Sequence, residues 1–198
     1  MKNQHTIYLL RHCEVEEQYD GVFRGGKLDC GLSEKGKTDS RQHVDFLVNN
    51  GVELVITSGM QRTDYIGNKL SEKRVAHTIQ PLFAEIDFGF WDGRTEEEVQ
   101  QQFPKEYREY RLCWQEKRGE DIVIPSGETM REVLERVGKG WGQTKPELAP
   151  VSAIVLHSVS MTCLLSYILN KPIKEVPYTE LGGMHEIALV KNRVSLLL

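Results

Sequence analysis

The dipeptide Arg11-His12 is the part of the sequence with the clearest chemical potential. It directly follows residues 6–10, an apolar, β-branched and aromatic run that predicts a buried strand, so both side chains are expected at the end of that strand. A neutral imidazole nitrogen is a nucleophile, and a planar guanidinium holds phosphoryl oxygens bidentately. The pair favours phosphate chemistry, although two residues alone more often mean a strand-end histidine beside a surface arginine.

Two further apolar segments end in ionisable residues. Residues 52–57 predict a strand followed by a helix that carries Arg62 near its start, and residues 153–156 predict a strand that ends at His157. Taken singly, Arg62 would be a solvated residue and His157 a hydrogen-bonded structural histidine. Because the carboxyl ends of parallel strands share one edge of a sheet, both are instead expected to converge with the Arg-His pair on a phosphate group.

Helical and strand patterns alternate along the rest of the chain. Ser33 is a helix N-cap, Thr95 opens a second helix with a capping box, and residues 126–128 open a third with apolar side chains at i, i+3, i+4 and i+7. The tail predicts a hairpin of residues 185–190 and 193–198. This alternation is typical of an α/β fold: a three-layer α/β/α sandwich whose central sheet is mostly parallel, with an antiparallel edge strand.

Composition limits the class of protein. The 198 residues contain no Gly/Ser/Pro-rich linker, so residues 1–198 are expected to form a single domain. The net charge of -4 argues against nucleic acid as a partner, and no segment resembles a signal peptide or a membrane span, which predicts a cytoplasmic protein without a membrane partner. The four cysteines form no CxxC pair, so neither a zinc site nor disulfides are expected. The exposed edge of the tail hairpin could pair between subunits and form a homodimer.

Six motifs occur in an order that is known from one superfamily. They are Leu10-Arg11-His12 with Glu14, Leu32-Ser33-Glu34-Lys35-Gly36, Ser58-Gly59-Met60-Gln61-Arg62-Thr63, Glu85-Ile86-Asp87-Phe88-Gly89-Phe90-Trp91-Asp92-Gly93, Ser126-Gly127-Glu128 and Val155-Leu156-His157. Over nearly its whole length the chain resembles the histidine phosphatase superfamily, the phosphoglycerate mutase-like proteins. Its short length and aromatic loop look most like the small bacterial phosphatases, including the α-ribazole-phosphate phosphatases.

The resemblance implies a mechanism for the phosphate site. His12 would attack phosphorus in line and form a phosphohistidine, while Arg11, Arg62 and His157 would bind the equatorial oxygens. Glu85, in the aromatic loop, would protonate the leaving alkoxide and then deprotonate the water that hydrolyses the phosphoenzyme. The resemblance implies neither a metal nor a cofactor.

Outside this machinery, the glycine-rich loop of residues 18–31 is expected to form a substrate rim, with Gln18 and Arg24 as its candidate contacts. The chain also departs from the family pattern near its site. Cys13 follows the nucleophile where the family has glycine, and Ser158 and Val159 replace two glycines after the second histidine. These side chains alter the volume of the pocket and the approach of the backbone to substrate.

The function expected from the sequence is a metal-independent phosphomonoesterase that acts on a small phosphorylated metabolite. The enzymatic alternative is a phosphotransferase of the phosphoglycerate mutase type, which would need a more enclosed site. A third hypothesis is a catalytically impaired protein that binds phosphorylated ligands without turnover, motivated by the departures at Cys13, Ser158 and Val159. A phosphatase of phosphohistidine proteins is a fourth, and a flat, open site would favour it.

Overall fold

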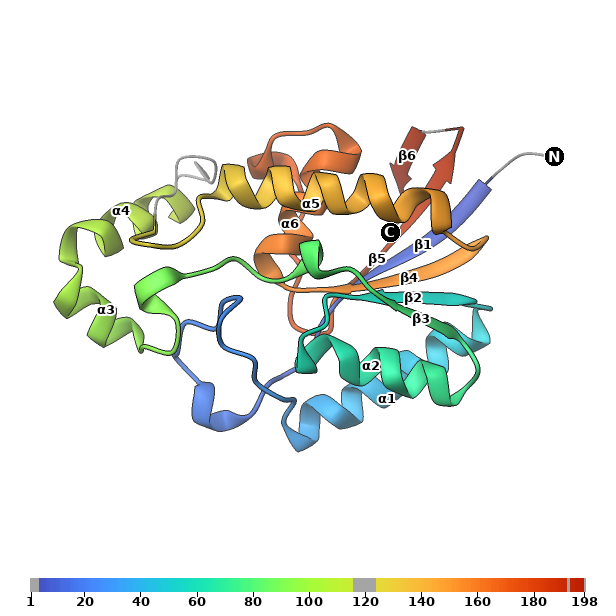
Figure 1. Cartoon of the computed structure of the whole chain (residues 1–198), viewed down its shortest axis with the longest axis horizontal. Coiled ribbons are helices and arrows are strands. Elements are labelled where there is room, and N and C mark those ends of the chain that lie inside the picture. Colours follow the sequence, from blue (N-terminus) through green and yellow to red (C-terminus); the bar gives the residue numbers. More distant parts are fainter. Residues whose placement is uncertain (1–3, 116–123, 192, 198) are drawn as a thin grey trace.

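The centre of the molecule is a six-stranded sheet with the strand order β3-β2-β4-β1-β5-β6, seen in a computed structural model that describes residues 4–115, 124–191 and 193–197 (Figure 1). The strands are β1 (Gln4–Arg11), β2 (Leu54–Thr57), β3 (Ala76–Ile79), β4 (Val151–Leu156), β5 (Met184–Val190) and β6 (Arg193–Leu196). β1, β4, β2 and β3 pair in parallel, whereas β5 pairs antiparallel with both β1 and β6. The mostly parallel sheet is confirmed, with a two-stranded antiparallel hairpin at one edge.

Helices cover both faces of this sheet, which confirms the three-layer sandwich (Figure 1). The helices α1 (Glu34–Asn49) and α2 (Gln61–Glu72) pack on one face, and α5 (Met130–Thr144) and α6 (Ser158–Leu169) on the other. The helices α3 (Glu96–Gln102) and α4 (Pro104–Gln115) lie to one side. Among the described residues, no helix has the length and apolar character needed to cross a membrane.

The apolar runs of the central strands are explained by burial on both faces. Along β1, Ile7 and Leu9 face the core under α5 and α6, while Tyr8 and Leu10 face the core under α1 and α2. Successive side chains of a strand point to opposite faces, so a strand that is covered twice must be apolar at every position. From Ile7 to Leu10, β1 therefore has no solvent-facing position before it reaches the site at its carboxyl end.

Most of the predicted helix starts agree with the structure. Ser33 accepts a hydrogen bond from the backbone N–H of Gly36 (2.9 Å), and Thr95 forms the expected capping box with Glu98. The third helix begins later than predicted, because Thr129 rather than a residue in 126–128 caps it, through a capping box with Glu132. In the tail hairpin, β6 ends at Leu196, and residue 198 of the predicted strand lies outside the described residues.

The topology brings the predicted site segments together. β2, β4 and β1 are neighbours in the sheet and run in parallel, so their carboxyl ends meet at one edge. The backbone N–H of His12 donates to the carbonyl of Leu156 (3.0 Å), which places His12 beside His157 at the ends of β1 and β4. The α2 helix begins four residues after β2 and carries Arg62 in its first turn.

Candidate active site

A cavity of about 600 Å³ opens at this edge of the sheet. Its lining includes Arg11, His12, Arg24, Glu85, Tyr110 and Tyr178. Phe23 and Phe88 add aromatic surface and lie edge to face, with ring centroids 5.1 Å apart. The cavity thus combines an Arg-His pair, a carboxylate and aromatic walls, and it is large enough for an organic group beyond a phosphate.

His12 is held as a neutral imidazole with one free lone pair. Its Nδ1 lies 2.7 Å from the carbonyl oxygen of Cys13, and because a carbonyl only accepts, Nδ1 carries the proton. The other nitrogen, Nε2, is then unprotonated. Burial, reinforced by the charges of Arg62 and Arg11, lowers the pKa of His12 from 6.5 to about 3. At neutral pH the side chain is therefore in the form that can attack phosphorus.

Arg11 is fixed at the cavity wall by the loop that precedes β5. Its Nη1 donates to the hydroxyl of Tyr178 (2.9 Å) and to the carbonyl of Thr179 (2.8 Å), and its guanidinium carbon lies 5.7 Å from the centroid of the Tyr178 ring. Its Nε is buried without a hydrogen-bond partner. A buried N–H without a partner is costly, and an anion bound in the cavity would supply the missing acceptor.

Arg62 and His157 lie behind the cavity and do not belong to its lining. Arg62, 1% exposed, donates from Nε to Nδ1 of His157 at 3.0 Å. Its two terminal nitrogens donate to backbone carbonyls of the glycine-rich loop, at Leu28 (2.8 Å) and Gly25 (3.1 Å). In this arrangement Arg62 ties the loop to the sheet edge, and direct contact between Arg62 and a phosphate stays a prediction.

The hydrogen bond from Arg62 also fixes the tautomer of His157. Because Nδ1 accepts, Nε2 carries the proton and donates to the hydroxyl of Ser58 at 2.8 Å. That hydroxyl contacts Thr63 (2.9 Å), whose own hydroxyl donates to the carbonyl of Met60 (2.9 Å). Burial, followed by the charge of Arg62, lowers the pKa of His157 well below 6.5. His157 is thus neutral, and its ring lies 5.2 Å from that of His12, centroid to centroid.

Glu85 is in the cavity lining at the start of α6. Its carboxylate accepts hydrogen bonds from the backbone N–H groups of Val159 (3.1 Å) and Ser160 (3.2 Å), and from that of Ile86 (3.0 Å). The side chain is 7% exposed, so the predicted acid has a fixed position inside the site.

The departures from the family pattern have different structural outcomes. Cys13 is 1% exposed and packs with Val15, Cys30 and Leu32, outside the cavity lining. Burial raises the pKa of its thiol, which disfavours the thiolate needed for nucleophilic attack. Ser158 and Val159, by contrast, line the cavity.

The two predicted rim residues take different positions. Arg24 lines the cavity and donates to the carbonyl of Tyr19 (2.6 Å), and burial lowers the pKa of its guanidinium. Gln18 is exposed and lies in a separate surface hollow beside Glu16. Sequence reasoning did not single out Tyr178 or Tyr110, although the Gly182-Gly183 pair after Tyr178 does signal a tight loop.

Arg111, a charged residue of α4 that the sequence allows as a substrate contact but favours as part of a solvated face, also lines the cavity. It lies 3.7 Å from the carboxylate of Glu96, and both side chains are about half exposed at the rim. Within the described parts of the chain, no group of three or more His, Cys, Asp or Glu side chains is arranged to hold a metal ion.

Comparison with models of protein families assigns this chain to one superfamily. Residues 7–193 match the model of the histidine phosphatase superfamily, branch 1. The chain belongs to this superfamily. Among solved structures, the superfamily members it resembles include the alpha-ribazole phosphatase from Shigella flexneri, with a TM-score of 0.84 at 19% identity, covering 98% of this chain and 95% of that one. A mycobacterial glucosyl-3-phosphoglycerate phosphatase has a TM-score of 0.82 at 19% identity, over 98% and 97% of the two chains.

Curated relatives within the superfamily include rat 6-phosphofructo-2-kinase/fructose-2,6-bisphosphatase 4, which is 29% identical over 185 residues, 87% of this chain and 34% of that protein. The chain thus spans about a third of the length of such relatives. Phosphoserine phosphatase 1 of Hydrogenobacter thermophilus is 28% identical over 174 residues, which cover 83% of this chain and 76% of the relative.

Proposed function

We propose that the protein is a metal-independent phosphomonoesterase that hydrolyses a small phosphorylated metabolite through a phosphohistidine on His12. The observation that supports this most directly is the state of His12: a buried, neutral imidazole with an unprotonated Nε2, in the lining of a cavity that it shares with Arg11 and Glu85. Membership of the superfamily is consistent with this activity.

In the first step, Nε2 of His12 forms a bond to phosphorus as the bond between phosphorus and the ester oxygen breaks. The leaving alkoxide takes a proton from the Glu85 carboxyl, and Arg11 binds the phosphoryl oxygens. In the second step, water attacks phosphorus, its proton passes to the Glu85 carboxylate, and the bond to His12 breaks to release phosphate. Arg62 and His157 hold the site from behind, and we propose that their charge and dipoles stabilise the phosphoryl group as it moves.

The walls of the cavity favour an ester with an organic leaving group that has apolar surface. Phe23, Phe88 and Tyr110 pack edge to face in one cluster, with centroids 5.1 to 6.4 Å apart, and Tyr178 lies against Arg11. Stacked or edge-on contacts with such rings stabilise bound apolar groups. The printed names of the relatives supply a panel of candidates: α-ribazole phosphate, phosphoserine, glucosyl-3-phosphoglycerate and fructose 2,6-bisphosphate.

Hydrolysis of p-nitrophenyl phosphate in the presence of EDTA tests this proposal. We expect turnover that survives chelation and that falls to background in His12→Ala. A rapid quench into alkaline detergent after mixing with 32P-labelled substrate should leave label that is stable to alkali and labile to acid on the natural protein and none on the variant, since phosphohistidine survives base and hydrolyses in acid. The metabolite panel then ranks substrates by kcat/KM.

A natural protein that binds vanadate but hydrolyses no ester on the panel would overturn the proposal and favour a phospholigand-binding protein. Transfer of phosphate between positions of a phosphoglycerate, faster than its release, would instead indicate a mutase. Loss of turnover on chelation, restored by an added divalent metal, would contradict metal independence.

A further inference from the structure

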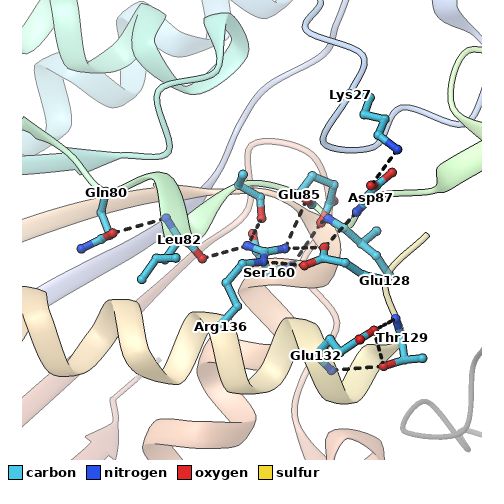
Figure 2. A network of polar contacts seen from close by, with 12 residues as sticks. Lys27, Gln80, Leu82, Glu85, Asp87, Glu128, Thr129, Glu132, Arg136 and Ser160 are labelled. Carbon is cyan, nitrogen blue, oxygen red and sulfur yellow. Dashed lines mark hydrogen bonds and ion pairs between the residues drawn. The ribbon is translucent and has the colours of Figure 1, made fainter. Parts of the chain in front are cut away.

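Glu85 is carried on a loop, yet a general acid must be held within a few tenths of an ångström of its working position. The loop of residues 82–87 has no regular hydrogen bonding after the short 3-10 turn Pro81–Phe83. The carboxylate is fixed at one end by the backbone of α6. The loop that carries Glu85 is contacted on its other side by a network of polar side chains (Figure 2).

The guanidinium of Arg136, from α5, lies at the centre of that network. Nη1 donates to the carbonyls of Leu82 (2.8 Å) and Ala84 (3.0 Å), and Nη2 contacts the carbonyl of Glu85 itself at 3.4 Å. One side chain therefore donates to backbone carbonyls of the loop at three of four successive positions (Figure 2). Because a guanidinium is planar and rigid, it sets the relative orientation of the carbonyls it binds.

Glu128 binds both Arg136 and the backbone of the loop. It holds Arg136 in a bidentate pair, Oε1 with Nε and Oε2 with Nη2, both at 2.7 Å. The same Oε2 accepts the backbone N–H of Asp87 (3.0 Å), and the backbone N–H of Glu128 donates to the carbonyl of Asp87 (2.9 Å). Both side chains are about four-fifths buried, so the fork has little solvent with which to exchange its bonds.

We propose that Arg136 and Glu128 form a clamp that positions Glu85 for proton transfer to the leaving group. Neither side chain lines the cavity, so both are positioning residues rather than catalytic ones. The inference rests on the proposed role of Glu85 as the acid. Arg136 would thus influence the chemical step from the far side of the loop, without touching the substrate.

The test separates leaving groups that need a proton from one that does not. p-Nitrophenolate departs without protonation, whereas an alkoxide such as that from β-glycerophosphate depends on the acid. The quantity to measure is kcat/KM, because it reports the steps up to formation of the phosphoenzyme. In Glu85→Gln we expect a loss of about 10²-fold or more with the alkyl ester and less than about tenfold with the aryl ester.

The clamp variants should reproduce this pattern in weaker form. In Arg136→Met we expect kcat/KM for the alkyl ester to fall by about 10²-fold, with a loss of a few-fold at most for the aryl ester. Arg136→Lys keeps the charge but lacks the fork, and should give an intermediate loss with the same selectivity. Arg131→Met is the matched control, because Arg131 is an exposed arginine of the same helix, and it should leave both esters unchanged.

Inhibition by vanadate and the unfolding midpoint are measured in parallel, to show that each variant keeps a folded phosphate site. If Arg136→Met does not fold, Arg136→Lys and Glu128→Gln carry the test with the same two esters. Equal losses with both esters in the clamp variants, beside a selective loss in Glu85→Gln, would overturn the clamp alone. A Glu85→Gln variant that loses both esters equally would overturn the role of Glu85 as acid, and the clamp with it.

Discussion

Two Arg-His pairs meet at the carboxyl edge of this sheet, and they differ in what their polar atoms do. In the front pair, Arg11 keeps a buried Nε without a partner and His12 keeps an unprotonated Nε2. In the rear pair, Arg62 donates to His157 and to carbonyls of the glycine-rich loop, and both ring nitrogens of His157 are bonded. The same residue types thus keep unused hydrogen-bonding atoms in the front pair, whereas the protein itself occupies those atoms in the rear pair.

The difference shows why residue type and strand-end position do not by themselves assign a role. Both histidines are buried, neutral and low in pKa. The two histidines differ in how many of their hydrogen-bonding atoms already have partners. A side chain whose polar atoms are all bonded inside the protein stabilises the fold, whereas one with an unbonded polar atom can bind a ligand. The following variants are chosen to test that separation.

The largest difference is expected between the two histidines. His12→Gln should lower turnover of p-nitrophenyl phosphate by about 10⁴-fold or more, because no nucleophile remains, with little change in stability. His157→Gln should cost activity by about 10- to 100-fold and lower the free energy of unfolding by about 1–3 kcal/mol, because buried partners lose their bonds. Equal losses of activity at unchanged stability would show that the two histidines share one role. Steady-state kinetics and urea unfolding measure both quantities.

The two arginines should differ in the same way, one affecting mainly stability and the other mainly binding of the phosphate analogue vanadate. Arg62→Met removes the donor from carbonyls at Gly25 and Leu28, and we expect it to lower the free energy of unfolding by about 2–4 kcal/mol. Arg11→Met should change stability by about 1 kcal/mol or less but raise the dissociation constant for vanadate by about 10- to 100-fold. Urea titrations and inhibition assays give the two readouts. An Arg62→Met variant that keeps its stability but loses vanadate binding would indicate that Arg62 contacts the phosphate directly.

Stability should also depend on pH because of the buried histidines. The pKa of His12 is about 3 in the folded state and about 6.5 in the unfolded chain, so below pH 6.5 the unfolded state binds a proton that the native state does not. The stabilisation is complete above pH 6.5 and is lost as pH falls toward 3, by about 1.4 kcal/mol per pH unit for each such histidine. Urea unfolding between pH 7.5 and 4.5 measures the slope. In His12→Gln the slope should be shallower, and an unchanged slope would contradict the assignment.

The smallest effect is expected at Cys13. The ring of His12 is oriented by the backbone carbonyl of Cys13 and not by its thiol, so Cys13→Ala should leave kcat/KM within about threefold. Loss of the buried sulfur should lower the free energy of unfolding by about 1–2 kcal/mol. A loss of activity above tenfold in Cys13→Ala would instead give the thiol a part in the reaction. Kinetics and thermal unfolding of the single variant suffice.

The sequence predicted the sheet, its helices and the convergence of the strand ends, because these depend on apolar periodicity and on rules for parallel sheets. It did not predict how Arg62 is used, since bonds to carbonyls of the loop at Gly25 and Leu28 depend on how a glycine-rich loop folds back over the sheet edge. Such bonds leave no periodic signal.

Arg136 escaped prediction for a related reason. A charged residue on an amphipathic helix normally marks a solvated face, and nothing local shows that its partners are carbonyls more than fifty residues earlier in the chain. Glu128 was recognised only as part of a motif, without its function. Gln18 shows the opposite case, because a polar residue in a functional loop need not face the cavity.

The position of β1 in the sheet determines when its contacts can form during synthesis. His12 is synthesised before residues 151–156 and 184–190, which form the strands β4 and β5 on either side of its own strand. The hydrogen bond from the backbone N–H of His12 to Leu156, and the strand pairing on both sides of β1, must wait for these later segments. This pairing is slow because it closes long loops. Until residues 184–190 have been made, the nascent chain therefore carries His12 without the assembled cavity that surrounds it in the folded protein.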